Sequence, residues 1–269
     1  MPPEKRISST SRGSVNSNLV SQMNDKITRV HVFNNLEFPL LGARKRDVGV
    51  SRSSIALAKI IPTLQGLSVL DLGCGIGYMT VGALKLGARH VTAIDVEDVE
   101  GILMRNVELN GFAGSDVSFV RGDSFSSINE SIKFGAIIAN LPQHAMPATP
   151  QAKRLLGKYG GFDGTDLVCR YMSEAAFYLS QGGSYFGSIS ELTNFRRTFS
   201  LAEYLYDIRI KRTATKRLKK NEMLPYLTDA EIHNHLEKLM QMKLVRFSRN
   251  APAGSVSYRV HYCEFILKN

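Results

Sequence analysis

The chain has 269 residues, of which 43% are hydrophobic, and this is enough for one large α/β domain with a genuine core. No apolar run approaches the roughly 18 residues that a membrane-spanning helix needs. The N-terminus lacks the apolar stretch of a secretion signal, so we expect a cytoplasmic protein without membrane contact. The net charge is +10, and the three cysteines lie far apart without metal-ligand spacing, so no metal site is predicted.

The segment before the regular part of the chain is short and irregular. Residues 1–20 carry few apolar side chains and no periodicity, so we expect a flexible tail. Residues 21–66 combine an alternating segment with a helix expected over 53–61, which Pro62 should end. We interpret residues 21–66 as an N-terminal cap or lid over a site in the catalytic domain that follows, residues 67–269.

Strands and helices alternate from residue 67 onward. Apolar or alternating runs predict strands at 68–72, 90–95, 117–121, 134–139, 184–190, 207–215 and 256–266. Helical periodicity predicts helices at 78–86, 99–110, 166–179, 192–205 and 229–242. This alternation is typical of βαβ units, so we expect an α/β fold with a doubly wound, mostly parallel, seven-stranded sheet of Rossmann-like type.

Positive charge is concentrated toward the carboxyl end of the chain. The segment Arg196–Lys220 holds nine Lys or Arg against Glu203 and Asp207, and so supplies +7 of the +10. We interpret residues 207–250 as a basic and helical insertion. A basic strip attracts nucleic acid or an acidic protein. However, no aromatic residue interleaves with the charges from Lys211 to Lys220, as a single-strand binding platform needs, so a solvated face is the alternative.

A glycine-rich turn follows the first strand of the domain. The run Asp71-Leu-Gly-Cys-Gly-Ile-Gly77 places Gly73, Gly75 and Gly77 between a strand and a helix. Glycine tolerates positive φ and lets a ligand approach the backbone closely. The spacing is G-x-G-x-G rather than the G-x-G-x-x-G of dinucleotide-binding folds, which argues against a nicotinamide-dependent dehydrogenase.

Polar residues also end the next three strands. Asp95 ends the second strand, Asp123 follows the third, and Asn140 follows the fourth. Open α/β sheets bind ligands at the carboxyl ends of their strands, where a carboxylate such as Asp95 can accept hydrogen bonds from ribose hydroxyls. The predicted cofactor-binding residues are Asp71, Gly73, Gly75, Gly77, Asp95, Val96, Asp123, Ser124 and Asn140.

Together these motifs resemble the class I S-adenosylmethionine-dependent methyltransferases, and most closely the HemK-like group with its Asn-Pro-Pro-Tyr motif. The stretch Tyr159-Gly-Gly-Phe-Asp-Gly164 is similar to a further segment of that group, and the resemblance covers roughly residues 48–190. It implies that the cofactor is S-adenosylmethionine. It also implies that the Gly73–Gly77 turn lies along the methionine part, that Asp95 holds the ribose and that Asp123 contacts the adenine.

The resemblance also implies which residues are catalytic. In the family, the motif asparagine orients a planar nitrogen toward the sulfonium methyl group, and the motif aromatic residue stacks on the substrate. Asn140 and Pro142 match the first and third positions, whereas Leu141 replaces the first proline and Gln143 replaces the aromatic residue. We predict Asn140, Pro142 and Tyr178 as catalytic residues, with Tyr178 supplying the missing ring. The other ring candidates are Phe134, Tyr159, Phe162 and Tyr171.

We therefore expect methyl transfer to a nitrogen or oxygen of a small substrate, because a lid excludes bulky partners. A second hypothesis is cyclisation of the cofactor itself, in which its α-amine attacks Cγ to give azetidine-2-carboxylate and methylthioadenosine. A third is a nucleic-acid or protein methyltransferase that uses the basic segment Arg196–Lys220. Products formed from S-adenosylmethionine alone distinguish the second hypothesis from the others.

Overall fold

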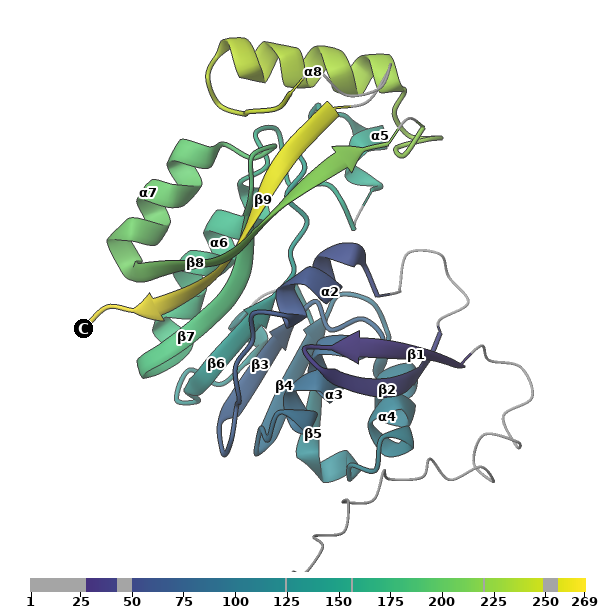
Figure 1. Ribbon diagram of the computed structural model, residues 1–269, viewed down its shortest axis with the longest axis vertical. Helices are drawn as coiled ribbons and strands as arrows, with labels where there is room; N and C mark the ends of the chain where they lie inside the picture. Colours follow the sequence, from purple (N-terminus) through teal and green to yellow (C-terminus); the bar gives the residue numbers. More distant parts are fainter. Residues whose placement is uncertain (1–27, 43–49, 124, 156, 220, 249–255) are drawn as a thin grey trace, which may run out of the picture.

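The computed structural model describes residues 28–42, 50–123, 125–155, 157–219, 221–248 and 256–269, so the tail predicted over 1–20 lies outside the described residues. Its centre is a seven-stranded sheet of order β5-β4-β3-β6-β7-β9-β8 (Figure 1). The first five are parallel neighbours, and β9 is antiparallel to both β7 and β8. The strands are β3 (Ser68–Leu72), β4 (His90–Asp95), β5 (Val117–Arg121), β6 (Phe134–Ala139), β7 (Leu179–Ser190), β8 (Tyr206–Leu218) and β9 (Val256–Leu267). The predicted doubly wound sheet is confirmed.

Helices cover both faces of this sheet. The helices are α2 (Arg52–Ala58), α3 (Tyr78–Lys85), α4 (Glu100–Leu109), α5 (Pro150–Lys153), α6 (Asp166–Tyr178), α7 (Phe195–Leu205) and α8 (Asp229–Gln241), with 3-10 turns at Gly114–Asp116 and Phe125–Ser127. One core cluster joins α2, α3 and α4 to the sheet, and a second joins α6 and α7 to its other face. Because both faces are covered, four of the five residues of the central strand β3 are buried, Asp71 among them. No helix within the described ranges is long and apolar enough to cross a membrane.

Helix α2 is shorter than the sequence predicts. The helix was expected over 53–61 with Pro62 as its stop, but it ends at Ala58. Ile60 and Ile61 leave the helix and bury their side chains, and Asn34 donates a hydrogen bond to the Ile61 carbonyl at 3.1 Å. Tertiary burial therefore ends this helix before the proline does.

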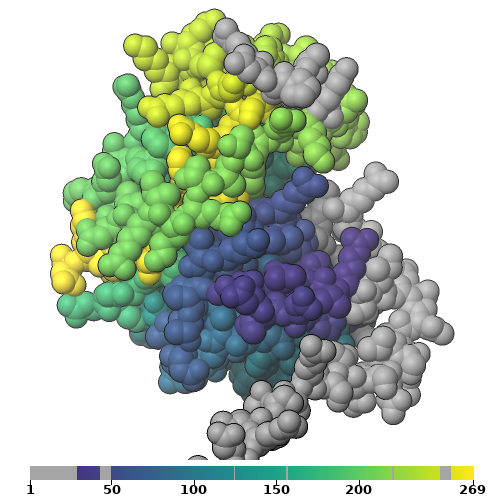
Figure 2. Space-filling view, viewed as in Figure 1, coloured from purple at the N-terminus to yellow at the C-terminus, as the bar shows by residue number. Residues whose placement is uncertain are grey.

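A separate two-stranded sheet, formed by β1 (Thr28–Phe33) and β2 (Leu36–Leu41), lies over helices α3 and α4. Figure 2 shows this hairpin, in purple, against the blue segments that follow it. The Asn106 carboxamide of α4 bonds both the N–H and the carbonyl of Leu41, at 2.7 and 3.3 Å. The Tyr78 hydroxyl donates to the Val32 carbonyl at 2.5 Å. These bonds attach the hairpin to α4 and to α3, the helix that follows the glycine-rich turn.

We expect Gly82→Ala in α3 to destabilise the protein by about 1–3 kcal/mol, the usual cost of overpacking. A Cβ at Gly82 would lie 2.2 Å from the fully buried Phe33 ring, which packs against Phe38 and Tyr78. Helix propensity alone favours alanine over glycine by up to about 1 kcal/mol, so the contact and the propensity oppose each other.

Urea unfolding measures the free energy of unfolding for this variant and for a matched control. The control is Gly101→Ala in α4, where a Cβ meets no atom within 4 Å, so propensity alone should act and stabilise the protein. Equal stabilisation by both substitutions would show that Phe33 does not pack on Gly82.

Candidate active site

The turn between β3 and α3 has a backbone that requires glycine. Gly73, Gly75 and Gly77 have φ values of 74°, 52° and 88°, a region in which other residues are strained. The N–H groups of Gly73 and Cys74 both donate to the Ile94 carbonyl, at 2.9 and 3.0 Å. The turn is thereby fastened to the end of the neighbouring strand β4.

A pocket opens beside this turn. It brings together the turn, the end of β3, the start of α3, the first turn of α2 and the residue after β6. The lining residues are Val50, Ser54, Asp71, Leu72, Gly73, Cys74, Gly75, Ile76, Tyr78, Met79 and Asn140. Four predicted site residues, Asp71, Gly73, Gly75 and Asn140, therefore meet in one pocket, as the convergence of parallel strand ends predicts.

Asp95 adjoins this pocket because its carboxylate is bonded to Gly75, a lining residue of the turn. One carboxylate oxygen accepts a hydrogen bond from the Gly75 N–H at 2.8 Å, and the other accepts from the Glu97 N–H at 3.0 Å. Each oxygen keeps a second lone pair for a ligand hydroxyl. The next residue, Val96, is half exposed. The side chain of Asp95 is thus placed for the ribose contact that the resemblance implies.

Asp123 lies on the loop after β5, outside the pocket lining. The Gly122 N–H donates to the Asp95 carbonyl at 2.9 Å, which joins this loop to the end of β4. The Tyr171 hydroxyl donates to the Asp123 carbonyl, and the Arg170 guanidinium lies 3.8 Å from its carboxylate. The Asp123 side chain is 70% exposed and so is available to a ligand. Ser124, predicted as a cofactor contact, lies outside the described residues.

Asp71 is a buried acid at the base of the pocket. Its side chain is 1% exposed, and it accepts a hydrogen bond from the Thr80 hydroxyl of α3 at 2.7 Å. Burial raises the pKa of Asp71 to about 7, and the nearby carboxylate of Asp95 adds to the shift. Asp71 therefore joins the end of β3 to α3. With a pKa of about 7, its carboxyl group is partly protonated near neutral pH.

The carboxamide of Asn140 is oriented by the first turn of α2. Its nitrogen donates to the hydroxyls of Ser51 and Ser54, at 3.1 and 2.9 Å. Ser51 is the N-cap of α2 and accepts from the Ser54 N–H at 3.0 Å. Because the nitrogen is occupied, the carboxamide oxygen is the group left for a ligand. Neither serine was among the predicted site residues, although the Ser51-Arg-Ser-Ser54 run shows a helix start.

The position that carries the aromatic residue in the HemK-like motif is structural here. The Gln143 nitrogen donates to the carbonyl and hydroxyl of Ser188, at 2.8 and 3.0 Å, and its oxygen accepts from the Ser190 N–H at 3.0 Å. Gln143 thus ties the loop after β6 to β7. Pro142 precedes it and is half-buried. The next residue, His144, packs edge-on against Tyr258, and burial lowers its pKa to about 4.

The aromatic candidates predicted from the sequence lie outside the pocket lining. Tyr178 stacks on Phe125 with ring centroids 4.9 Å apart and donates to the Phe125 carbonyl at 3.2 Å, and it is not one of the residues that line the pocket. The other candidates, Phe134, Tyr159, Phe162 and Tyr171, are likewise outside the lining. Tyr78 is the aromatic residue that the structure brings to the pocket wall. Its position immediately after Gly77 was the available signal.

Comparisons with known proteins found similarity over the central part of the chain. The family model described as ribosomal protein L11 methyltransferase (PrmA) matches residues 55–162. A ribosomal protein L11 methyltransferase of Syntrophomonas wolfei is 33% identical over 105 residues, 38% of this chain and 34% of that protein. A provisionally named protein N5-glutamine methyltransferase of Methanocaldococcus jannaschii is 27% identical over 157 residues, 56% of this chain and 75% of that protein. The chain thus spans about a third of the first relative.

Solved structures agree with the fold. The T. thermophilus 16S rRNA N2 G1207 methyltransferase, solved with AdoMet and guanosine, has a TM-score of 0.50, 17% identity, and coverage of 88% of this chain and 50% of that one. The YcgJ protein of Bacillus subtilis has a TM-score of 0.51, 12% identity, and coverage of 80% and 97%. The predicted resemblance to class I methyltransferases is confirmed. The HemK-like subgroup is not, since the matching family model is the L11 one.

Proposed function

We propose that this chain, a class I S-adenosylmethionine-dependent methyltransferase by fold and sequence, transfers the cofactor's methyl group to a nitrogen of a macromolecular acceptor. One observation carries the proposal. The glycine-rich turn, the buried Asp71 and the oriented Asn140 line the same pocket, with the Asp95 carboxylate bonded to the turn.

The pocket residues fit the cofactor that the family implies. A Cβ at Gly73 would meet no atom within 4 Å, so the backbone there is open to a ligand. Asp95 retains lone pairs for ribose hydroxyls, and the exposed Asp123 carboxylate can accept from an adenine amino group. When bound, S-adenosylmethionine supplies an electrophilic methyl carbon on a sulfonium and leaves as S-adenosylhomocysteine.

The chain's own part in the reaction is positioning. The Asn140 carboxamide oxygen accepts an N–H of the acceptor and so fixes the direction of the nitrogen lone pair. Ser51 and Ser54 hold the carboxamide in that orientation. With S-adenosylmethionine held by the glycine-rich turn and Asp95, this orientation would aim the nitrogen lone pair at the methyl carbon, and the proton of the methylated nitrogen would leave to solvent. Correct alignment supplies most of the acceleration in such a displacement.

The proposed acceptor is a macromolecule, whereas the sequence predicts a small substrate. We expected a small substrate, because residues 21–66 were interpreted as a lid. The relatives are named for ribosomal protein L11 and protein glutamine, and a structural neighbour is named for 16S rRNA. These names support a macromolecular acceptor instead. Residues 43–49 of the predicted lid lie outside the described residues.

The test is incubation with S-adenosylmethionine alone and with acceptors, followed by mass spectrometry of all products. The acceptors are bacterial ribosomal proteins and ribosomal RNA, supplied separately. We expect S-adenosylhomocysteine only when an acceptor is present, together with a mass gain of one methyl group on that acceptor. Methylthioadenosine formed without an acceptor would overturn the proposal in favour of cofactor cyclisation. Failure of calorimetry to detect binding of S-adenosylmethionine or S-adenosylhomocysteine would overturn both.

A further inference from the structure

Strand β8 carries a row of cations on the side of the sheet that α2 covers. Cross-strand pairing assigns the side: Arg212 lies opposite Tyr262 and Lys216 opposite Tyr258, and both tyrosines belong to the core cluster that includes α2. Arg209 lies opposite Glu264 on the same side. We call Arg209, Lys211, Arg212 and Lys216 the basic track.

A break in the strand pairing adds one cation to this side. The register shifts between Ile210 and Arg212, so that Arg212 does not alternate to the opposite face but lies on the side of Arg209 and Lys211. The Lys211 ammonium lies 3.2 Å from the Glu264 carboxylate, which also lies 3.8 Å from Arg209. Two cations therefore share one carboxylate that is only 12% exposed, whereas Arg209 and Lys211 are 63% and 41% exposed. The acids of β8 and β9 on this side are Asp207 and Glu264, against four cations, so the track keeps a net positive charge.

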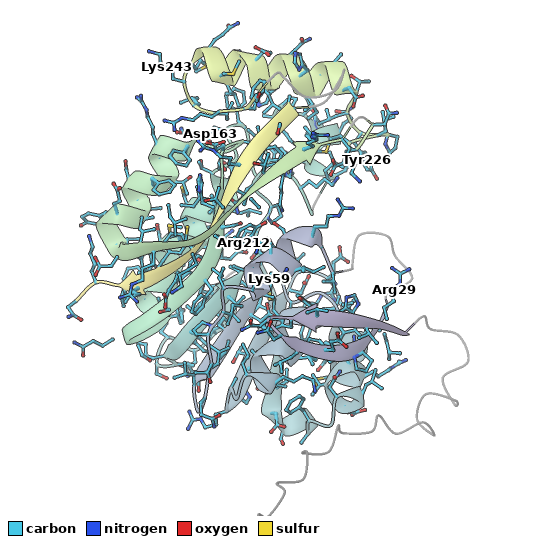
Figure 3. The ribbon with its side chains drawn as sticks, in the orientation of Figure 1. Arg29, Lys59, Asp163, Arg212, Tyr226 and Lys243 are labelled. Carbon is cyan, nitrogen blue, oxygen red and sulfur yellow. The ribbon has the colours of Figure 1, made fainter. Side chains whose placement is uncertain are left out.

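The basic track reaches the wall of the active-site pocket. The Lys216 ammonium donates to the Ser53 hydroxyl of α2 at 2.7 Å and lies 5.6 Å from the centre of the Tyr262 ring. The next residue, Ser54, lines the pocket and holds Asn140. Figure 3 labels Arg212 in β8 and Lys59 just after the end of α2, and in this view the strand and the helix lie next to each other.

We propose that the basic track binds the phosphate backbone of a nucleic acid by charge alone, without the base stacking of a single-strand platform, and leads one of its nucleotides to the pocket. The proposal rests on the methyltransferase function above and names the class of its acceptor. Arg209 to Lys216 span about 23 Å at the usual rise of a strand, so the row can follow several phosphates. Cations in a row bind a polyphosphate by charge neutralisation and counterion release, without needing an apolar contact.

An acidic protein fits this surface less well. Protein interfaces have an apolar core within a polar rim. The exposed large hydrophobic residue of β8 is Ile210, at 52%, and it lies opposite Cys263 on the other face of the sheet. On the track's own side, the tyrosines opposite Arg212 and Lys216 are buried. The side of β8 that adjoins the pocket thus offers charge without exposed apolar area.

The test measures binding of a fluorescein-labelled single-stranded RNA of 20 mixed-sequence nucleotides by anisotropy, from 50 to 200 mM salt, with a DNA of the same sequence beside it. Four phosphate contacts predict a slope of log K against log salt of about −3, since each contributes about 0.7 on a single strand. The triple variant Arg209→Gln, Lys211→Gln, Arg212→Gln should flatten the slope to about −1 and weaken binding at 50 mM salt by about tenfold or more.

A matched variant controls for the loss of charge. Arg196→Gln, Arg217→Gln, Lys238→Gln also removes three exposed cations, but from α7, the other face of β8 and α8. It should keep the slope of the unmodified protein. Equal losses in the two triple variants would overturn the inference, and so would a polyglutamate peptide that binds as tightly as the RNA.

Calorimetry with S-adenosylmethionine on the same proteins separates this inference from the proposed function. We expect both triple variants to bind the cofactor like the unmodified protein, which also shows that they fold. Cofactor binding without RNA or DNA binding would overturn the basic track alone. If the unmodified protein does not bind the cofactor, the methyltransferase function itself is overturned, whatever the RNA result.

Discussion

Replacing Asn140 by alanine is expected to lower kcat by about 10²–10³-fold, the usual cost of losing one group that aligns the reacting atoms. The carboxamide oxygen is the group left to receive the acceptor N–H, because the nitrogen is bonded to Ser51 and Ser54. The Kd for S-adenosylmethionine, measured by calorimetry, should change by no more than about threefold, since in the proposed site the turn and Asp95 would hold most of the cofactor.

The serine variant Ser54→Ala is the matched control for this effect. It keeps the carboxamide but removes the closer of its two hydroxyl partners, so kcat should fall by only about 3–10-fold, the value of one neutral hydrogen bond. Steady-state rates with the acceptor found by product analysis measure both variants. A fall of less than about threefold in Asn140→Ala, or a larger loss in Ser54→Ala than in Asn140→Ala, would contradict the role given to the asparagine.

The second large effect concerns stability, and its sign is unusual for a carboxyl group. The pKa of Asp71 is about 7 in the folded protein, against an ordinary value of 3.8. The folded state therefore holds this proton more tightly than the unfolded state, and the free energy of unfolding falls as the pH rises from about 4 through 7. A shift of this size corresponds to about 4 kcal/mol at pH 8, of which about 2–3 kcal/mol is lost between pH 5 and 8.

Asp71→Asn removes the titration and keeps an oxygen that can accept from Thr80. Urea unfolding at pH 5 and pH 8 measures the free energy of unfolding of both proteins. The difference, variant minus unmodified protein, should rise by about 2–3 kcal/mol from pH 5 to pH 8. The comparison uses the difference between the two proteins, because the lowered pKa of His144 favours the folded state as the pH rises from about 4 to 6.5, in both alike. Parallel pH profiles would show that Asp71 is not a buried acid with a raised pKa.

The interior of the fold could be predicted from the sequence more closely than its edges. The strands expected at 68–72, 90–95, 117–121 and 134–139 coincide with β3, β4, β5 and β6. Strands covered on both faces need continuous apolar runs, and this makes their limits visible. Strand β7 instead begins at Leu179, five residues before the expected start. A shift in its pairing with β6 accommodates the Gly182-Gly183 pair inside the strand, where the sequence favours a turn.

In the active site, the residues required by the local backbone could be predicted from the sequence. The side-chain contacts between distant segments could not. The glycines of the turn and the acids at the strand ends each follow from a local requirement of the chain. The carboxamide of Asn140 meets serines 86 and 89 positions away, and Gln143 bonds a strand 45 positions away. No local pattern contains such pairings. The same reason explains why Tyr178 seemed a candidate ring, while Tyr78 is the aromatic residue at the pocket wall.

The place of β9 in the sheet also has a consequence for folding while the protein is being synthesised. It is the last of the described strands along the chain, yet it lies between β7 and β8 and is bonded to both. While the ribosome is still translating α8, two long strand edges therefore have no partner in their own chain. Unpaired edges recruit strands from other molecules. The nascent protein is thus most exposed to aggregation before β9 leaves the exit tunnel.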